Sequence, residues 1–541
     1  INIGTGANTF RDDGNGKVSH DAIAVGSNAA AKGDASIAIG NASSSPTQAS
    51  IAVGNGATAL KTESIAIGKG ATSNNDLDIA IGRDAKSKGG QTVSLGSDAK
   101  TDGQAAVAIG RQANATANAA VAIGSDANAS AQNTVAVGIA AKATNQRGVA
   151  VGTSSEATAD NTVAVGGFSK AEAERATAVG LLAKASGESS FAGGAAANAS
   201  GSNSIAIGGA TDGTSADSKS AAKAAGAQAI AVGYKSKAIA DNSIAQGNAA
   251  NASAANATAI GTNSNASGEN SIAQGNTANA SAANATAIGT ESTASGQYAT
   301  ALGTASNATA IHTVALGSAS TASKDGAISV GYNTNATEKN SLALGFGAQS
   351  THKDSVALGA ASVTGKAVAV PSKYIGGESY TFAGGNPASV VSVGVAGKER
   401  QIQNVAAGQI EPTSTDAVNG SQLYAVSDAI SKHHWVLSGN ASANLSHRDT
   451  NVTNGGIVDF QNGDGTIATV TTEKIDKSSP ATRNVVKYHA NIVNSTTTTV
   501  TKNADGSISI NAIGGTDTTA AVTTKTPDAL KVTSKTENNV T

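Results

Sequence analysis

The stretch SIAIG, Ser36 to Gly40, recurs along most of the chain in the general form [ILVT]-A-[ILV]-G. The glycine that ends the motif falls every 14 residues from Gly26 to Gly208 and, after one step of 25 residues, every 14 residues again from Gly233 to Gly359. Self-similarity at a fixed period indicates one supersecondary unit stacked many times. The sequence therefore predicts a solenoid over most of its length.

The pattern inside the unit predicts which solenoid this is. SIAIG alternates large and small side chains and favours β-branched residues, which is typical of a strand, and glycine permits a tight turn after it. Alanines three and five residues past the glycine, as at Ala57 and Ala59, indicate a second short strand. Each repeat is thus predicted to be one coil of a narrow, all-β parallel solenoid. At about 4.8 Å per coil, the motif coils predict a rod on the order of 100 Å long.

A coil of 14 residues encloses little room, so small residues such as Ala38 and Ala66 are expected inside it. The larger residues, such as Ile37 and Ile39, are then expected outside the coil. They would form an apolar ladder too long to remain exposed to solvent on a monomer. Three or more such ladders meeting on the axis of a symmetric homo-oligomer would bury it. The opposite assignment places isoleucine inside the coil, and it would allow a monomeric rod.

Glutamine replaces one of the large residues in DNSIAQG and ENSIAQG, at Gln246 and Gln274. If the large residues face the oligomer axis, these amides do too, and alternate coils place Thr258 and Thr286 at the other large position. We expect the four residues to form axial polar layers that hydrogen-bond around the axis and fix the register of the chains. The alternative is that both glutamines reach solvent through a loosened interface.

The irregular step contains GATDGTSADSKSAAKAAGAQ, residues 209–228, with 11 residues beyond the normal repeat. Because the period restarts intact at Gly233, the segment from Asp212 to Lys223 is predicted to project as a loop, and loops on rigid scaffolds often carry recognition. The alternative is that the insertion is merely tolerated. The candidate binding residues in this loop are Asp212, Thr214, Asp217, Lys219 and Lys223.

The amino-acid composition argues against several classes of function. Of 541 residues only 3% are aromatic while 63 are glycine, which argues against a large globular core, and a net charge of −2 gives no overall basic footprint for nucleic acid or anionic lipid. Cysteine is absent, and so are metalloprotease, hydrolase, P-loop and dinucleotide motifs. We therefore expect that the protein is not an enzyme and that it holds neither a cofactor nor a metal ion. We also expect neither a signal peptide nor a membrane anchor within this stretch.

The repeat and the sequence that follows it together resemble one known protein family. NSIAIG, Asn203 to Gly208, followed by RQIQNVAAGQIEPTSTDAVNGSQL, Arg400 to Leu423, resembles the YadA-like head and neck of trimeric autotransporter adhesins. The resemblance implies a homotrimer of left-handed parallel β-rolls on the outer membrane of a Gram-negative bacterium. It also implies that Ile402, Val405 and Leu423 lie between subunits in a neck that crosses toward a neighbouring chain. The family's membrane anchor is not recognised here, so the chain is expected to be a surface-exposed passenger segment.

The resemblance also divides the chain. It assigns a head to residues 1–394, a neck with a short helix to 395–431, a tryptophan-ring-like domain to 432–489 and a β-rich domain of Gly-Ile-Asn type to 490–541. Independently, the spacing of Leu423, Val426 and Ile430 predicts one face of a helix. The Thr, Val and Asn composition beyond it predicts a second, antiparallel β module.

The family implies a cell-surface adhesin. Its members attach to matrix proteins such as collagen, fibronectin or laminin, to host receptors, to one another or to abiotic surfaces, and a rigid rod multiplies weak contacts by avidity. One alternative is a structural spacer that holds another binding domain away from the membrane. A second is an ice- or crystal-face-binding solenoid, which would need a flat Thr-x-Thr ladder where the outward positions here mix Asn, Ser, Lys, Asp and Thr.

Overall fold

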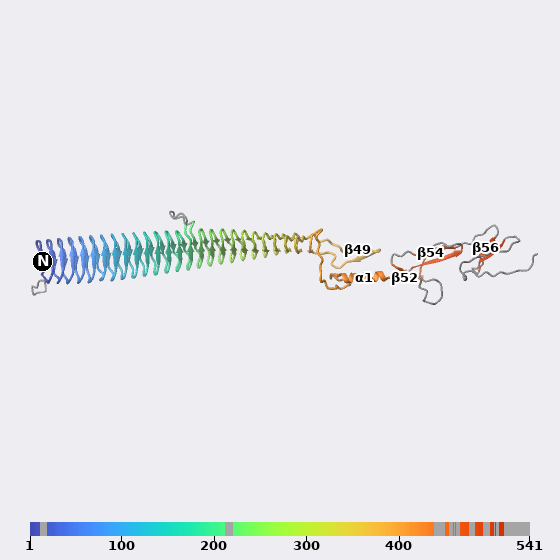
Figure 1. Ribbon diagram of the computed structural model, residues 1–541, viewed down its shortest axis with the longest axis horizontal. Coiled ribbons are helices and arrows are strands. Elements are labelled where there is room, and N and C mark those ends of the chain that lie inside the picture. The colour runs from blue at the N-terminus through green and yellow to red at the C-terminus, as the bar shows by residue number, and fades with distance from the viewer. Residues whose placement is uncertain are drawn as a thin grey trace, which may run out of the picture. The chain divides into compact units, whose positions relative to one another are not determined.

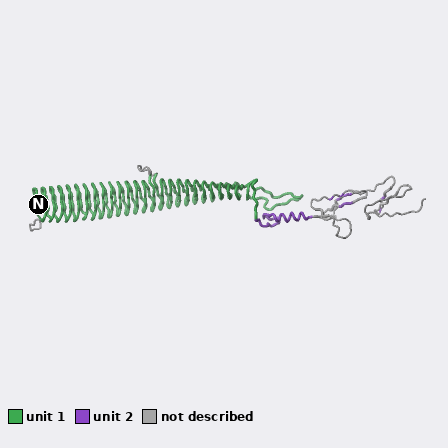
Figure 2. The backbone as a smooth tube through the Cα atoms, in the orientation of Figure 1, with its two compact units in different colours: residues 1–403 green, residues 404–541 purple. Residues whose placement is uncertain are grey.

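The computed structural model describes residues 1–10, 19–210, 220–437, 450–453, 458, 460, 466–474, 482–490, 498–502, 504 and 508–512. The chain divides into two compact units, residues 1–403 and 404–541 (Figure 2). The first unit is a parallel β-solenoid. The second holds α1 and antiparallel hairpins, and each unit is described by itself below.

Each coil of the first unit contributes a strand of three residues to a long parallel sheet (Figure 1). These strands carry even numbers from β2 (Ile23–Val25) to β48 (Val356–Leu358), and they begin every 14 residues except between β28 (Ile205–Ile207) and β30 (Ile230–Val232). With β1 (Asn2–Ile3) and β51 (Val391–Ser392) they form a 26-stranded sheet. The 14-residue coil predicted from the motif is confirmed.

A second parallel sheet is built from strands of two residues. They carry odd numbers from β3 (Ala30–Ala31) to β47 (Gln349–Ser350), with the same period and a longer step only between β27 (Asn198–Ala199) and β29 (Lys223–Ala224). Each residue pairs with its counterpart one coil on, as Asn251 does with Asn265. Equivalent side chains therefore stack in columns along both sheets.

The turns explain why glycine ends every motif. Gly54 has φ +138°, and a Cβ added there would lie 2.4 Å from the carbonyl oxygen of Gly68 in the next coil. The second turn of each coil also needs a left-handed residue, and asparagine supplies it at several successive coils, with φ 57° at Asn256 and 55° at Asn270. Asparagine accepts this conformation better than most residues because its short polar side chain can hydrogen-bond locally.

Small side chains fill the inside of the coils. Ala38 and Ala66 are fully buried, whereas Ile39 is 39% exposed and Ile67 is 37% exposed. The assignment with alanine inside is confirmed, and the alternative with isoleucine inside is wrong, because two short strands enclose room for little more than a methyl or hydroxymethyl group. Among the described residues that are fully buried in the coils, serine and threonine accompany alanine, and Asp78 is the single charged side chain.

Asp78 occupies a position where other coils carry a hydroxyl. Ser64 donates its hydroxyl to the carbonyl oxygen of Lys61, three residues back, at 2.6 Å. The Asp78 carboxylate instead accepts the N–H of Asn75, three residues back, at 2.9 Å, and two further hydrogen bonds from Thr92. The Thr92 hydroxyl begins an internal chain of hydroxyl contacts of 2.6 to 3.1 Å through Ser87, Thr101 and Ser94. The alanine core is interrupted here, between Ala71 and Ala99.

The C-terminal end of the solenoid departs from the repeat within the stretch assigned to the head, which extends to residue 394. Beyond Thr364 the chain leaves the stack and forms a hairpin of β49 (Ser372–Ile375) and β50 (Glu378–Thr381), then returns so that β51 pairs with β48. The small inward residues of the repeat are missing from this stretch, and Pro371 cannot donate to a ladder. The Arg400 guanidinium closes the end, donating to Ser362 Oγ at 3.0 Å and to the carbonyl oxygens of Val393 and Ala360.

The second unit contains the predicted helix and the predicted antiparallel strands. Helix α1 (Gly420–Lys432) begins with a capping box in which Asn419 and Gln422 exchange side-chain and backbone hydrogen bonds. No helix in the described part of the chain is long and apolar enough to cross a bilayer. The antiparallel pairs are β52 (His434–Leu437) with β53 (Thr450–Thr453), β54 (Thr466–Lys474) with β55 (Thr482–Ala490), and β56 (Thr498–Lys502) with β57 (Ile508–Ala512).

Candidate binding surfaces

The interior of the solenoid is closed, so its chemistry lies on the outer faces. The inward positions hold small side chains with 0% exposure over nearly the whole stack. Within the described ranges, no three His, Cys, Asp or Glu side chains gather in an arrangement that could hold a metal ion. Binding is therefore sought in the side chains that project from the two sheets and the turns.

The outer face of the long sheet is apolar. Each of its strands projects its first and third residues, which are mostly isoleucine, valine or leucine, and here we call this surface the apolar face. Many of these side chains are more than a third exposed in a single chain. Examples are Leu95 at 41%, Ile207 at 43%, Leu302 at 41%, Leu344 at 38% and Leu358 at 43%. An exposed apolar surface of this extent marks an interaction site.

The four residues expected in axial polar layers lie on this apolar face. Gln246 ends β32 (Ile244–Gln246) and is exposed, with Val232 and Ile260 as its neighbours in the column. Gln274 holds the same place two coils further on. Thr258 occupies the first outward position in the coil between them, and Thr286 occupies it in the coil after Gln274. Gln246, Thr258 and Gln274 each lie between apolar side chains in their columns. Thr286 lies between Ile272 and Thr300. The meeting of these residues across an axis with other chains stays a prediction.

The outer face of the second sheet is polar. The first residue of each odd-numbered strand projects from it, and we call the column of these residues the polar ladder. Its members are Ala30, Ser44, Thr58, Thr72, Lys86, Lys100, Asn114, Asn128, Lys142, Glu156, Lys170, Lys184, Asn198, Lys223, Lys237, Asn251, Asn265, Asn279, Thr293, Asn307, Thr321, Asn335 and Gln349.

Asparagine amides on the polar ladder bond to one another along the stack. Asn251 donates from Nδ2 to Oδ1 of Asn265 at 2.8 Å, and Asn265 donates to Oδ1 of Asn279 at 2.8 Å. Asn114 and Asn128 form the same contact at 3.1 Å. These bonds hold the amides in a fixed orientation, so the ladder presents a rigid row of donors and acceptors at a spacing of about 4.8 Å.

One carboxylate interrupts the cations of the polar ladder. Glu156 lies between Lys170, at 2.8 Å, and Lys142, at 3.6 Å. The hydrogen bond from Lys170, helped by the charges of both lysines, lowers the pKa of Glu156. The same hydrogen bond, which Glu156 accepts, raises the pKa of Lys170. Both groups are held in their charged forms at neutral pH.

Aromatic side chains stack at the turns. The rings of Tyr298 and His312 lie 5.0 Å apart with nearly parallel planes, and those of Tyr332 and Phe346 lie 5.5 Å apart. Lys235 places its ammonium 5.0 Å from the ring of Tyr234. Residues one coil apart are in contact at the turns as well as in the strands, which brings rings 14 positions apart together.

Four of the five candidate loop residues, Asp212, Thr214, Asp217 and Lys219, lie outside the described residues. Lys223 is described, and its placement corrects the predicted boundary of the loop: it begins β29 and pairs with Asn198 and Lys237 inside the stack. The buried neighbours Ala222 and Ala224 anchor it there, because both fill inward positions. The coils before and after the insertion pair directly.

The neck residues are exposed to different degrees in a single chain. Ile402, in the first unit, is 69% exposed. In the second unit Leu423 is 67% exposed, while Val405 is half-buried and its carbonyl oxygen accepts a hydrogen bond from Asn419 at 3.1 Å. Nothing in a single chain tests whether they lie between subunits, so the neck interface stays a prediction.

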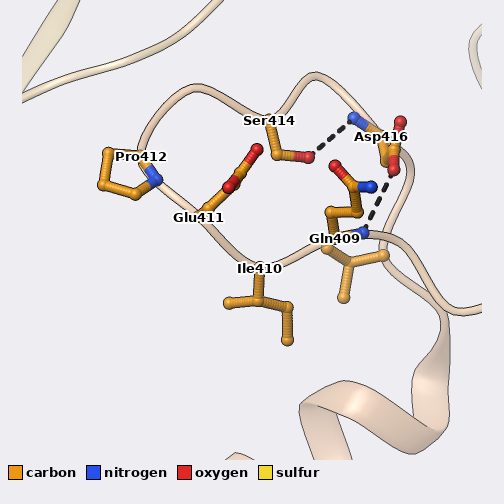
Figure 3. Close-up of a pocket in the computed structure, with 7 residues that line it drawn as sticks. Gln409, Ile410, Glu411, Pro412, Ser414 and Asp416 are labelled. Carbon is orange, nitrogen blue, oxygen red and sulfur yellow. Dashed lines mark hydrogen bonds between the residues drawn. The ribbon is translucent and has the colours of Figure 1, made fainter.

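A shallow pocket opens in the loop that precedes α1 (Figure 3). Asp416 Oδ2 accepts the backbone N–H of Gln409 at 3.1 Å, and Ser414 Oγ accepts the N–H of Asp416 at 3.2 Å. These bonds shape the loop, and its apolar residue Ile410 stays 73% exposed. The lining residues are Gln409, Ile410, Glu411, Pro412, Ser414, Asp416 and Val418.

Sequence reasoning missed two features of these surfaces. The clustering of lysine on the polar ladder is visible only when the coils are aligned on their glycine and the fourth residue after it is compared, with allowance for the insertion that displaces Lys223. The aromatic stacks require residues 14 positions apart to be compared. Both signals lie in columns of the repeat rather than in contiguous motifs.

Comparison with known families finds two matches. The model described as the YadA head domain repeat matches over half of the chain, and the model described as the coiled stalk of trimeric autotransporter adhesin matches residues 401–446. The head matches cover residues 19–43, 48–71, 102–127, 129–155, 157–183, 184–211, 238–264, 266–292, 294–320, 308–334, 322–348 and 336–362.

Individual proteins match over shorter stretches. The autotransporter adhesin BtaE of Brucella suis is 41% identical over 122 residues, which is 22% of this chain and 16% of that protein, so the match spans about a sixth of the curated relative. The C-terminal YadA-like domain of a Burkholderia pseudomallei protein is 46% identical, over 18% of this chain and 46% of that one, with a TM-score of 0.18. The collagen-binding domain of the Yersinia adhesin YadA is 27% identical, over 38% and 84%, with a TM-score of 0.25.

Proposed function

Because the chain belongs to the trimeric autotransporter adhesins, we propose that it attaches a bacterium to other surfaces through many weak contacts spread along the outer faces of its coils. Members of this family are non-enzymatic surface proteins, anchored in the outer membrane. The proposal places the contacts on the polar ladder and the turns beside it. No single pocket is assigned the binding role.

The observation that carries the proposal is the contrast between the two sheets. The apolar face consists mostly of isoleucine, valine and leucine, whereas no member of the polar ladder is a large apolar residue. A rod with one apolar and one polar face is suited to bury the first in an oligomer and to offer the second to a partner.

In the trimer that we propose, the three apolar faces meet on a common axis. Gln246, Gln274, Thr258 and Thr286 then form polar layers in that column. In the neck, Ile402, Val405 and Leu423 lie between subunits. Three polar ladders face outward, so contacts repeat both along each rod and around the axis, and avidity can exceed a single-site affinity by about 10² to 10⁴.

Matrix proteins or host-surface receptors are the proposed partners. A direct test is to coat surfaces with collagen, fibronectin, laminin and host-cell membranes and to measure adhesion of the folded trimer. Binding to at least one partner, lost when the trimer is dissociated, is the expected result. Uniform lack of binding by a correctly folded trimer would overturn the proposal.

Removing coils separates an adhesive rod from a structural spacer. Deleting residues 241–268 removes two coils and joins Ala240 to Glu269 in the same register, because residues 269–296 nearly repeat the deleted sequence. If the rod itself binds, the shortened trimer adheres more weakly to the same partners. If the rod is only a spacer, the shortened trimer should adhere as strongly as the full-length trimer. Thermal hysteresis in either form would instead favour an ice-binding role.

A further inference from the structure

Lysine is unevenly distributed along the polar ladder. All seven of its lysines lie within the 11 members from Lys86 to Lys237, while the members on either side are uncharged. In this part of the ladder the other members are Glu156 and three asparagines. The chain as a whole has a net charge of −2, so this cationic stretch is a local feature of one face.

Several of these lysines stand next to each other. Lys86 pairs with Lys100, Lys170 with Lys184, and Lys223 with Lys237, each in adjacent strands. Like charges on neighbouring strands destabilise a sheet. Neutral asparagine fills the same position in other coils, so the fold does not require lysine here. A destabilising arrangement that the fold does not require indicates a function outside the fold.

Nearby carboxylates neutralise only part of this charge. Asp102 lies 2.6 Å from Lys100, Glu172 lies 3.1 Å from Lys184, and Glu156 is shared by Lys142 and Lys170. Lys223 and Lys237 are exposed and make no ion pair with a carboxylate among the described residues. The stretch from Lys142 to Lys237 therefore keeps an excess of positive charge.

The geometry suits a linear polyanion. Ladder positions recur about every 4.8 Å in a straight column, so the ammonium groups lie along one line parallel to the stack. This stretch of the ladder contains no arginine and no aromatic residue, which are the side chains that stack on nucleic acid bases. Lysine acts as a flexible point charge and can meet anionic groups without a fixed fork geometry.

We propose that the ladder from Lys142 to Lys237 binds sulfated polysaccharide chains laid along the rod. The inference deepens the proposed adhesin function and rests on it, because it names one class of ligand for the same outer face. Binding is electrostatic and shared among five lysines per chain, with asparagine amides between them as hydrogen-bond donors. Three such ladders per trimer multiply the contact.

The test measures binding of the trimeric chain to immobilised heparin at several salt concentrations. The triple variant K184Q/K223Q/K237Q is expected to bind about tenfold more weakly or worse, with a shallower dependence on salt, since fewer counterions are released. Glu156→Gln frees Lys142 and Lys170 and is expected to bind about two- to threefold more tightly than the wild type. A misfolded protein would not gain affinity, so this variant keeps the test decisive.

A matched control separates the ladder from net charge. The variant K69Q/K324Q/K339Q removes the same charge from exposed turn residues and is expected to bind heparin like the wild type. Equal losses in both triple variants would overturn the proposal, as would preference for duplex DNA over heparin, or equal binding of desulfated heparin. Adhesion of the wild type to matrix proteins is measured in parallel. If the wild type does not adhere to them, the proposed adhesin function is contradicted. If it adheres to them but does not bind heparin, only the glycan ligand is contradicted.

Discussion

Asp78 Oδ1 accepts two hydrogen bonds from Thr92, one coil further along: one from the backbone N–H at 3.0 Å and one from the hydroxyl at 2.6 Å. Both residues are fully buried. A carboxylate thus links two coils from the inside, whereas the hydroxyls at this position in coils such as those of Ser50, Ser64 and Thr134 bond within their own turn.

Asp78→Ala is expected to destabilise the solenoid. It leaves the N–H groups of Thr92 and Asn75 without their acceptor, and each buried unpaired donor costs about 1 to 3 kcal/mol. Asp78→Asn, which keeps one acceptor oxygen, should lose less. Denaturant unfolding followed by circular dichroism measures both. Ser64→Ala removes a hydroxyl from the same position in another coil, and equal stability of the Asp78→Ala and Ser64→Ala proteins would show that the inter-coil link is unimportant.

Gly275→Ala is expected to disrupt the stack. Gly275 has φ +140°, and an added Cβ would lie 2.4 Å from the carbonyl oxygen of Gly289. The combined strain and clash should lower the free energy of unfolding by about 3 kcal/mol or more. Gly347 is the control, since its φ is also positive, +63°, but nothing lies within 4 Å of an added Cβ. There alanine should lower the free energy of unfolding by only about 1 kcal/mol. Similar melting curves for the two variants would contradict the close-approach argument.

Gln246→Ile should raise the melting temperature of the trimer. If the apolar faces meet on an axis, the substitution replaces a buried amide by an apolar side chain, which often stabilises a protein by about 1 kcal/mol or more. It should also give more misaligned assemblies, detectable by electron microscopy, because a register-fixing layer is lost. Gln349→Ile makes the same change on the polar ladder. An equal rise in both variants would mean that Gln246 does not face an axis.

The pair Glu156 and Lys170 should make stability depend on pH at both extremes. The lowered pKa of Glu156 gives stability that is present above the usual glutamate pKa of about 4.3 and is lost as the pH falls through the lowered value. The raised pKa of Lys170 gives stability that is present below about 10.4 and is lost as the pH rises through the raised value.

Because both side chains are partly exposed, the effect should be at most about 1 kcal/mol. Urea unfolding of the wild type and Glu156→Gln at pH 7 and pH 3 measures it: the difference between the two proteins should shrink at pH 3. A difference that stays constant between these pH values would assign the effect to packing rather than charge.

Leu423→Asp should weaken assembly of the neck. Leu423 is 67% exposed in a single chain, and burying a carboxylate between subunits is unfavourable. Light scattering after size-exclusion chromatography should show dissociation at concentrations where the wild type stays trimeric. Ala425→Asp, on the opposite side of α1, should remain trimeric. Dissociation of both variants would point to loss of the helix rather than of an interface.

The period of the glycines is enough to predict the coil and its contents. With two strands and two turns in 14 residues, only small residues fit inside, and this argument alone places Ala38 inward and Ile39 outward, as the structure confirms. The hairpin from Ser372 to Thr381 was missed because it interrupts the repeat within a stretch assigned to the head.

Other features depend on contacts that the sequence does not encode locally. Asp78 resembles a surface residue in NNDLDIAIG, and its burial becomes clear only once its position in the coil is known. The lysine stretch of the polar ladder emerges only when the coils are superposed. Which side chains meet on an axis depends on the other copies of the chain. The sequence therefore predicts that Gln246 lies on the outer face of its strand, but not which residues of another chain it contacts.

The stacking of the coils also determines how the head carries tension. Hydrogen bonds between successive coils run along the stack, so a pull along its length loads the junctions in series, and the weakest junction opens first. Each opened coil releases 14 residues, which extend to roughly 40 Å more than the coil occupied. Under tension the stack would therefore lengthen in steps, each step dissipating load at one junction while the other coils stay paired.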